Sequence, residues 1–192
     1  MAIDNFLICN PVIRKLSLIN LNLSNENLKV FSGTIASNKT LRSLNLSANQ
    51  LKDTGAQQIA EILRSNTSLR KLRCDQNMFT TLGMIRILDS LKSNKSLVKL
   101  QAENNRFTLS RRFLAVIGDL VIYHNRHLRQ LILTCYSNMV LQLSNSDAHK
   151  SVSSDLEFNS LSHADKQMVE NYKKLIRDNS LLVLFVIWVI YI

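Results

Sequence analysis

Basic and amide side chains recur every 28 residues along the first two thirds of this chain, and they are the groups best suited to bind a partner. Rows of arginine and lysine attract acidic surfaces over long distances, while amides add directed hydrogen bonds. The sequence predicts a partner-binding set at nine positions. These are Arg42, Asn45, Arg70, Lys71, Arg73, Asp75, Lys99, Gln101 and Glu103.

Most of this charge lies in two columns, which are Arg14, Arg42, Arg70 and Arg129 in one and Lys15, Lys71 and Lys99 in the other. Ser43 and Gln130 interrupt the second column. The columns stand between regularly spaced leucines, so we expect them on a solvent-facing surface. Such a surface either binds an acidic protein or only keeps the fold soluble, with pairs such as Arg73–Asp75 and Lys99–Glu103 partly cancelling.

No catalytic constellation stands out. The sequence contains no glycine-rich phosphate loop, no HExxH pair and no nucleophile elbow. His124 and His127 lie three residues apart, but no third ligand has a recognisable metal-binding spacing. Cys9, Cys74 and Cys135 cannot form a disulfide framework, and Cys74 replaces a repeat leucine, which indicates a buried apolar residue. We therefore expect no catalytic residue, metal, cofactor or small-molecule substrate.

The charge balance favours an acidic protein as the partner. The 192 residues carry a net charge of +10, and residues 1–134 hold 19 Lys and Arg against 8 Asp and Glu. Hydrophobic residues make up 46% and charged residues 20%, as in ordinary globular proteins. Nucleic acid is a less favoured partner, because base stacking needs exposed aromatic residues among the basic ones, and none stands in these columns.

The elements that must position these side chains repeat with the same period. The rungs of this ladder are Leu44, Leu72 and Leu100 for leucine, and Asn49, Asn77 and Asn105 for asparagine. Leucines two residues apart, as at 44 and 46, predict a short strand, whereas the spacing of Ile59 and Leu63 predicts a helix. Each copy reads L-x-x-L-x-L-x-x-N-x-L, the leucine-rich-repeat pattern.

Asparagine has two expected roles in each repeat. The Asn49, Asn77 and Asn105 side chains can donate and accept hydrogen bonds, so we expect them to satisfy the backbone where each strand turns back. Leu21 and Tyr136 replace this asparagine in the first and fifth copies, and there the array should be irregular. The Ser-Asn pairs ending at residues 38, 66 and 94 should close the helices, with Asn as a left-handed C-terminal cap.

Four to five copies of this unit resemble the ribonuclease-inhibitor-like class of leucine-rich repeats. That class also forms the sensing end of nucleotide-binding (NLR-type) immune receptors and occurs in some secreted bacterial effectors. The resemblance covers about residues 12–134. It implies an α/β leucine-rich-repeat solenoid, a short right-handed arc with a parallel sheet on its concave face and helices on its convex face. It also implies non-catalytic protein–protein interaction through the concave face.

We expect five regions: an N-terminal cap over 1–12, the repeats over 13–134, a linker over 135–161, a helical appendage over 162–178 and an apolar tail over 181–192. The tail, Leu181–Ile192, forms a helix of about 18 Å at most, too short to cross a bilayer core of about 30 Å. It either packs on the end of the solenoid as a strand or helix, anchors shallowly in a membrane, or is the relic of a longer membrane segment.

The overall expectation is a protein-interaction module in the cytoplasm. Unpaired cysteines favour a reducing compartment, and the N-terminus shows no export signal. A membrane-associated scaffold held by Leu181–Ile192, or a bacterial-type effector acting in a host cytoplasm, is the alternative.

Overall fold

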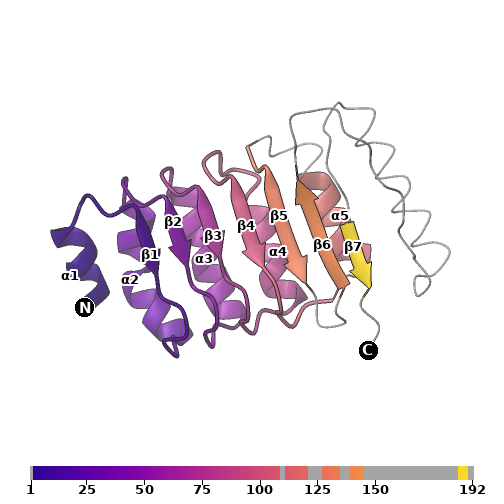
Figure 1. Cartoon of the computed structure of the whole chain (residues 1–192), viewed down its shortest axis with the longest axis horizontal. Coiled ribbons are helices and arrows are strands. Elements are labelled where there is room, and N and C mark those ends of the chain that lie inside the picture. Colours follow the sequence, from indigo (N-terminus) through magenta and orange to yellow (C-terminus); the bar gives the residue numbers. More distant parts are fainter. Residues whose placement is uncertain (1, 109–110, 121–126, 135–138, 145–185, 190–192) are drawn as a thin grey trace.

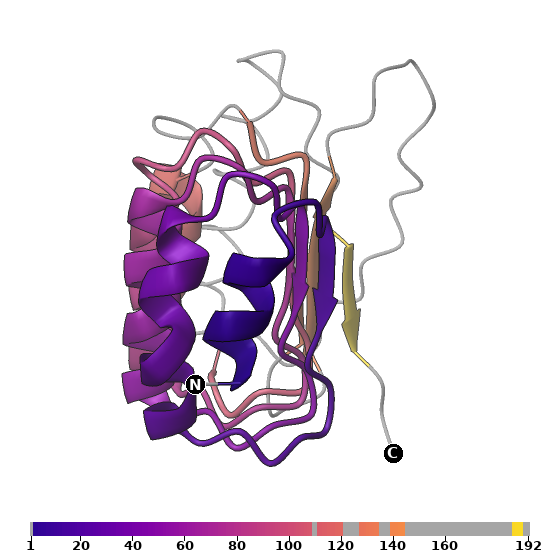
Figure 2. The same cartoon turned by 90° about the vertical axis from the view of Figure 1, so that its left-hand side faces the viewer.

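The computed structural model describes residues 2–108, 111–120, 127–134, 139–144 and 186–189. In this part of the chain a seven-stranded sheet runs in the order β1-β2-β3-β4-β5-β6-β7, and helices cover one of its faces (Figures 1 and 2). The strands are β1 Lys15–Ser17, β2 Ser43–Asn45, β3 Lys71–Arg73, β4 Lys99–Ala102, β5 Gln130–Thr134, β6 Met139–Ser144 and β7 Val186–Val189. The helices are α1 Ala2–Cys9, α2 Asn25–Ser37, α3 Asp53–Ser65, α4 Thr81–Ser90 and α5 Arg111–Asp119. The predicted α/β leucine-rich-repeat fold is confirmed.

The first five strands pair in parallel with the register that the 28-residue period requires. Leu16 pairs with Leu44, Leu44 with Leu72 and Leu72 with Leu100. Because side chains alternate across a strand, this register places the leucines on one face, where Leu44, Leu72 and Leu100 are at most 1% exposed. The residues on either side of each leucine therefore stand on the opposite face, which we call the open face.

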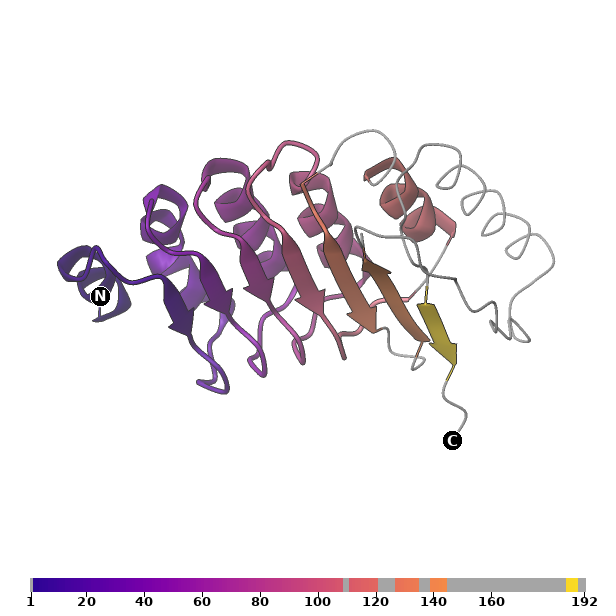
Figure 3. The same cartoon turned by 45° about the horizontal axis from the view of Figure 1, so that its top comes forward.

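The helices bury the other side of this core. Ile59 and Leu63 of α3 and Ile87 and Leu88 of α4 are all buried against it. At the start of the array α1 lies between the helix layer and the strand layer, where Leu7 is buried (Figure 2). Figure 3 shows the strands side by side with the helices behind them. The apolar interior is thus continuous from α1 to β5.

Each strand leaves the sheet through a left-handed residue followed by the ladder asparagine. Asn20, Ala48, Gln76 and Asn104 have φ between 51° and 56° and are 28 residues apart. The Asn77 Nδ2 atom then donates to the carbonyls of Leu46 (3.0 Å), Cys74 and Asp75 (both 3.1 Å). Its Oδ1 atom accepts from the Leu51 amide at 3.2 Å. One buried amide therefore satisfies backbone groups in two successive repeats.

The neighbouring rungs repeat this arrangement. Asn49 Nδ2 donates to the carbonyls of Leu18 and Leu46, and Oδ1 accepts from the amides of Leu21 and Leu23. Asn105 Nδ2 donates to the Cys74 carbonyl, and Oδ1 accepts from the Phe79 amide. In the first repeat Leu21 does not enter the core and is 55% exposed. Tyr136 lies outside the described residues.

The asparagines at the helix ends differ from the sequence prediction. Asn38 and Asn66 have φ of −65° and −79°, so neither is a left-handed cap. The Asn66 Oδ1 atom instead accepts from the amides of Ser68 (2.8 Å) and Leu69 (2.7 Å), while Nδ2 donates to carbonyls of Ile35 (2.7 Å) and Asn38 (2.9 Å). Asn94 makes the same set of bonds one repeat later. A second asparagine ladder therefore ties each helix end to the preceding repeat.

A third ladder joins the helix starts. The Asp53 side chain accepts from the backbone amide of Thr80 at 2.8 Å, and Asn25 accepts from that of Lys52 at 3.0 Å. Gly83 faces Asp53 so closely that a Cβ atom would clash with its carboxylate oxygen, and a Cβ atom on Gly55 would lie 2.6 Å from the Asn25 amide oxygen. The two glycines therefore keep room for the ladder that crosses from one repeat to the next.

The sheet continues beyond the repeats. Residues 139–144, predicted as part of a linker, form β6 and pair antiparallel with β5, so the linker prediction is wrong there. Val186–Val189 of the apolar tail forms β7 and pairs antiparallel with β6, as in the strand alternative. The predicted helix over 162–178 and the rest of Leu181–Ile192 lie outside the described residues. Within the described part, no helix has the length and apolar character needed to cross a membrane.

Replacing Ala48 by glycine should stabilise the protein. Alanine at a φ of 56° costs about 1–2 kcal/mol, and the extra freedom of glycine in the unfolded chain takes back about 0.4–1 kcal/mol. We expect a net gain of about 0.5–1 kcal/mol in urea unfolding. The matched change Ala60→Gly, inside α3, should instead cost about 1 kcal/mol or more. Destabilisation by Ala48→Gly would contradict the left-handed turn.

Candidate functional site

The open face is built by the two residues that flank each buried leucine. One row contains Lys15, Ser43, Lys71, Lys99 and Gln130, which are paired in register across the strands. The next row contains Ser17, Asn45, Arg73, Gln101 and Ile132. The strand pairing therefore brings the predicted residues Lys71, Arg73, Lys99 and Gln101 together at the centre of the face.

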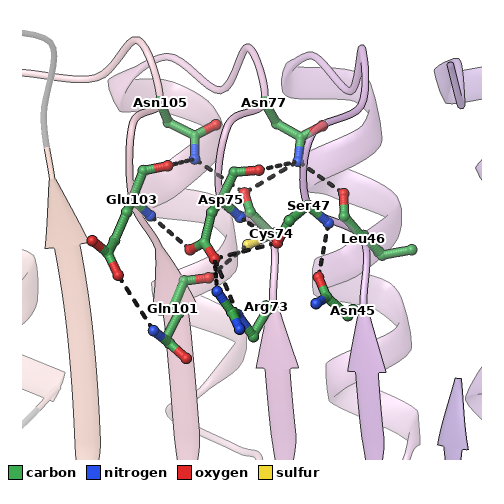
Figure 4. A network of polar contacts seen from close by, with 10 residues as sticks. All are labelled: Asn45, Leu46, Ser47, Arg73, Cys74, Asp75, Asn77, Gln101, Glu103 and Asn105. Atoms are coloured by element: carbon green, nitrogen blue, oxygen red, sulfur yellow. Dashed lines mark hydrogen bonds and ion pairs between the residues drawn. The ribbon is translucent and has the colours of Figure 1, made fainter. Parts of the chain in front are cut away.

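Not all of the nine predicted residues are available to a partner. Asp75 is only 7% exposed, and its carboxylate is used inside the protein. Its Oδ2 atom accepts from Ser47 Oγ at 3.3 Å and from Arg73 Nε and Nη2 at 3.1 and 3.0 Å (Figure 4). Its Oδ1 atom accepts from the Glu103 amide at 3.0 Å. Asp75 therefore connects three repeats and is a structural residue.

Arg42 and Arg70 also have structural bonds. Arg42 Nη1 donates to the carbonyl of Ser68 at 2.9 Å, and Arg70 Nη1 donates to that of Ser96 at 2.7 Å. Both carbonyls belong to the turn that leads into the following repeat. Each guanidinium thus bridges two repeats with one terminal nitrogen and stays exposed with the others.

The remaining candidates lie at the ends of the strands. Asn45 Oδ1 accepts from the Ser47 amide at 3.0 Å, and Gln101 Nε2 donates to Glu103 Oε1 at 3.3 Å. Arg73 has a side chain that is 51% exposed although it pairs with Asp75. The exposed cations at the centre are therefore Lys71 and Arg73, with the half-buried Lys99 beside them.

A hollow at the start of β1, β2 and β3 was not singled out by the sequence. It has a volume of about 340 Å³ and is lined by Arg14, Lys15, Arg42, Ser43, Arg70 and Lys71. The sequence pattern contained the signal, because Ser43 is the short residue in a column of lysines. Recognising a hollow there required the strand register.

The described residues show no arrangement suited to metal or thiol chemistry. Among them, no group of three or more His, Cys, Asp or Glu side chains is placed to hold a metal ion. Burial raises the pKa of the Cys74 thiol far above its usual value, with a smaller contribution from the neighbouring Asp75 charge. A neutral, fully buried thiol is a core side chain, as the sequence predicted for Cys74.

Comparison with known proteins gives a specific family. Residues 15–146 match the family described as TMOD/LMOD Leucine-rich domain. No curated protein matches the sequence of this chain. Among solved structures, the chain is similar to "Leiomodin-1 Actin-Binding Site 2 (ABS2)", with 20% identity and a TM-score of 0.61, covering 91% of this chain and 88% of that one. It is also similar to a tropomodulin C-terminal domain of Caenorhabditis elegans, with 15% identity and a TM-score of 0.61, covering 91% of this chain and 93% of that one.

Substitutions at Asp75 and Arg73 should separate structure from surface. Asp75→Ala removes the acceptor of four hydrogen bonds in a buried place, so it should destabilise the protein by about 2–3 kcal/mol. Arg73→Ala removes only the exposed partner and should cost less than about 1 kcal/mol. Urea unfolding measures both, and equal costs would show that Asp75 is not a structural bridge.

Proposed function

The chain belongs to the family of TMOD/LMOD leucine-rich domains, and on that premise we propose that it is a non-catalytic module that binds actin through the open face of its sheet. The family match carries this proposal, because it spans β1 to β6 and so includes the whole open face of the repeats. Actin is chosen because the similar leiomodin-1 structure is named as an actin-binding site.

The charge of the open face agrees with an acidic region on the partner. Lys71, Arg73 and Lys99 lie on neighbouring strands β3 and β4, about 5 Å apart. Gln101 adds a hydrogen-bonding amide beside Arg73. Exposed cations at this spacing raise the rate of encounter with an acidic surface, and the amide contributes orientation. The binding surface proposed is therefore the centre of the face, at Lys71, Arg73, Lys99 and Gln101.

Protein is the better class of partner than nucleic acid. Phe79 and Phe107 of the repeats are buried, and Phe107 packs on Phe113 with ring centroids 5.1 Å apart. The open face, as far as the structure describes it, therefore presents no aromatic ring on which a base could stack. Cations without stacking partners suit carboxylates of a protein surface.

The double variant Arg73→Ser/Lys99→Glu should bind actin at least about tenfold more weakly than the unmodified chain, because it removes two cations from the centre of the face. Sedimentation with actin filaments and a solution assay with actin monomers measure the affinity. The matched variant Arg64→Ser/Lys29→Glu makes the same changes at exposed positions on α3 and α2 and should bind within about twofold of the unmodified chain.

Two results would contradict this proposal in different ways. Equal weakening by both variants would place binding outside the open face. An unmodified chain that binds neither filaments nor monomers would exclude actin as the partner. Melting temperatures within about 2 °C of the unmodified chain confirm that the variants are folded.

A further inference from the structure

The hollow at the start of β1, β2 and β3 carries an unusual concentration of positive charge. Of its six lining residues, Arg14, Lys15, Arg42, Arg70 and Lys71 are cationic and Ser43 is a short hydroxyl. No carboxylate lines it. At about 340 Å³ it is at the lower end of the volumes that bind small molecules.

The register of the strands explains why there is a hollow. Lys15 pairs with Ser43, and Ser43 pairs with Lys71, so the two lysines rise from strands about 10 Å apart with the short serine between them. Arg14, Arg42 and Arg70 stand one residue earlier on the same three repeats. A long side chain at position 43 would fill the space that Ser43 leaves open.

Two of the arginines are already held in place. Arg42 and Arg70 each use Nη1 to bond a carbonyl of the next repeat, at 2.9 and 2.7 Å. Arg42 Nη1 also lies 3.3 Å from the Lys39 carbonyl. Their Nε and Nη2 atoms have no partner among the described residues. Because the guanidinium groups are fixed before binding, a ligand loses less side-chain entropy when it engages them.

The charge of the hollow is not neutralised within the described part of the protein. Arg14, Lys15 and Lys71 make no ion pair there, and Asp75 is buried at the other end of β3 against Arg73. Five like charges around one small space repel one another. A bound anion would relieve this repulsion and gain charge-assisted hydrogen bonds from the arginines.

Charge density selects the class of anion. Two phosphate groups bring about three to four negative charges within one small molecule. An extended acidic peptide brings one charge per residue, so four charges occupy about 13 Å of chain, longer than the distance between the two lysine strands. Planar guanidinium groups also match phosphate oxygens in pairs. We propose that this hollow binds a compact ligand with two or more phosphate groups, whether a free polyphosphate or the headgroup of a lipid.

The test uses the full chain and inorganic tripolyphosphate, with binding followed by isothermal titration calorimetry at low salt. Saturable binding at one site is expected, at least about tenfold tighter than for orthophosphate or a tetra-aspartate peptide. Arg14→Glu/Lys15→Glu should weaken binding at least about tenfold, since both side chains are exposed and make no hydrogen bond or ion pair in the described structure. Arg64→Glu/Lys29→Glu changes the net charge equally, outside the hollow, and should bind within about threefold of the unmodified chain.

Three results would overturn the proposal: no saturable binding of tripolyphosphate, equal weakening by the two charge-reversal pairs, or equal affinity for the tetra-aspartate peptide. These outcomes are independent of actin binding, since Arg14 and Lys15 lie outside the surface at Arg73 and Lys99. A folded Arg14→Glu/Lys15→Glu variant is verified by its melting temperature.

Sedimentation with phosphatidylcholine vesicles, with and without a lipid that has a bisphosphorylated headgroup, distinguishes the two sources of the ligand. If tripolyphosphate binds, retention on the phosphorylated vesicles identifies a headgroup as a competent ligand. Binding of tripolyphosphate without retention on the vesicles identifies the ligand as a soluble polyphosphate.

Discussion

The interaction on which the structure depends most is the hydrogen bonding of buried asparagine side chains between successive repeats. Where a strand leaves the sheet, its amides and carbonyls lose their partners, and a buried unpaired backbone group costs about 1–3 kcal/mol. Asn49, Asn77 and Asn105 supply those partners, each to backbone groups of its own repeat and of the preceding one. A repeat can therefore complete its own turn only when its neighbour is in place, and stacking follows from this requirement as much as from apolar burial.

The same dependence between neighbours occurs at both ends of the helices. Asn66 and Asn94 connect each helix end to the previous repeat, while Asn25 and Asp53 connect each helix start to the next. These bonds set the distance and register between copies, so they also set the spacing of side chains on the open face. The polar groups inside the protein thus determine where its surface cations stand. A family of this kind can change those cations freely while the interior stays the same.

The repeat architecture was predictable because its signals are local and periodic. Leucines two apart, helical spacing and a 28-residue period lead to β1–β5 and α2–α4 without any knowledge of the fold. The helix-end asparagines were misread because a left-handed cap and a ladder residue have the same sequence signature, and only the neighbouring repeat distinguishes them. β6 was missed for a related reason: six residues, Met139–Ser144, become a strand because β5 offers an unpaired edge, which short sequences do not reveal. The hollow depends on three strands in register, so no single repeat contains it.

The open face shows how fold and binding share one set of charged residues. Asp75 is fully engaged inside the protein, and Arg73 is half engaged through it. Arg42 and Arg70 give one nitrogen each to the turns and keep their remaining donors outside. Arg14, Lys15 and Lys71 make no hydrogen bond or ion pair within the described structure, yet they stand close enough to oppose one another. Folding alone does not require charge there, since a serine at position 43 occupies the same row without loss of pairing. Cations that the fold does not need, gathered beside residues that it has already fixed in position, are the part of this surface whose presence is explained by a ligand.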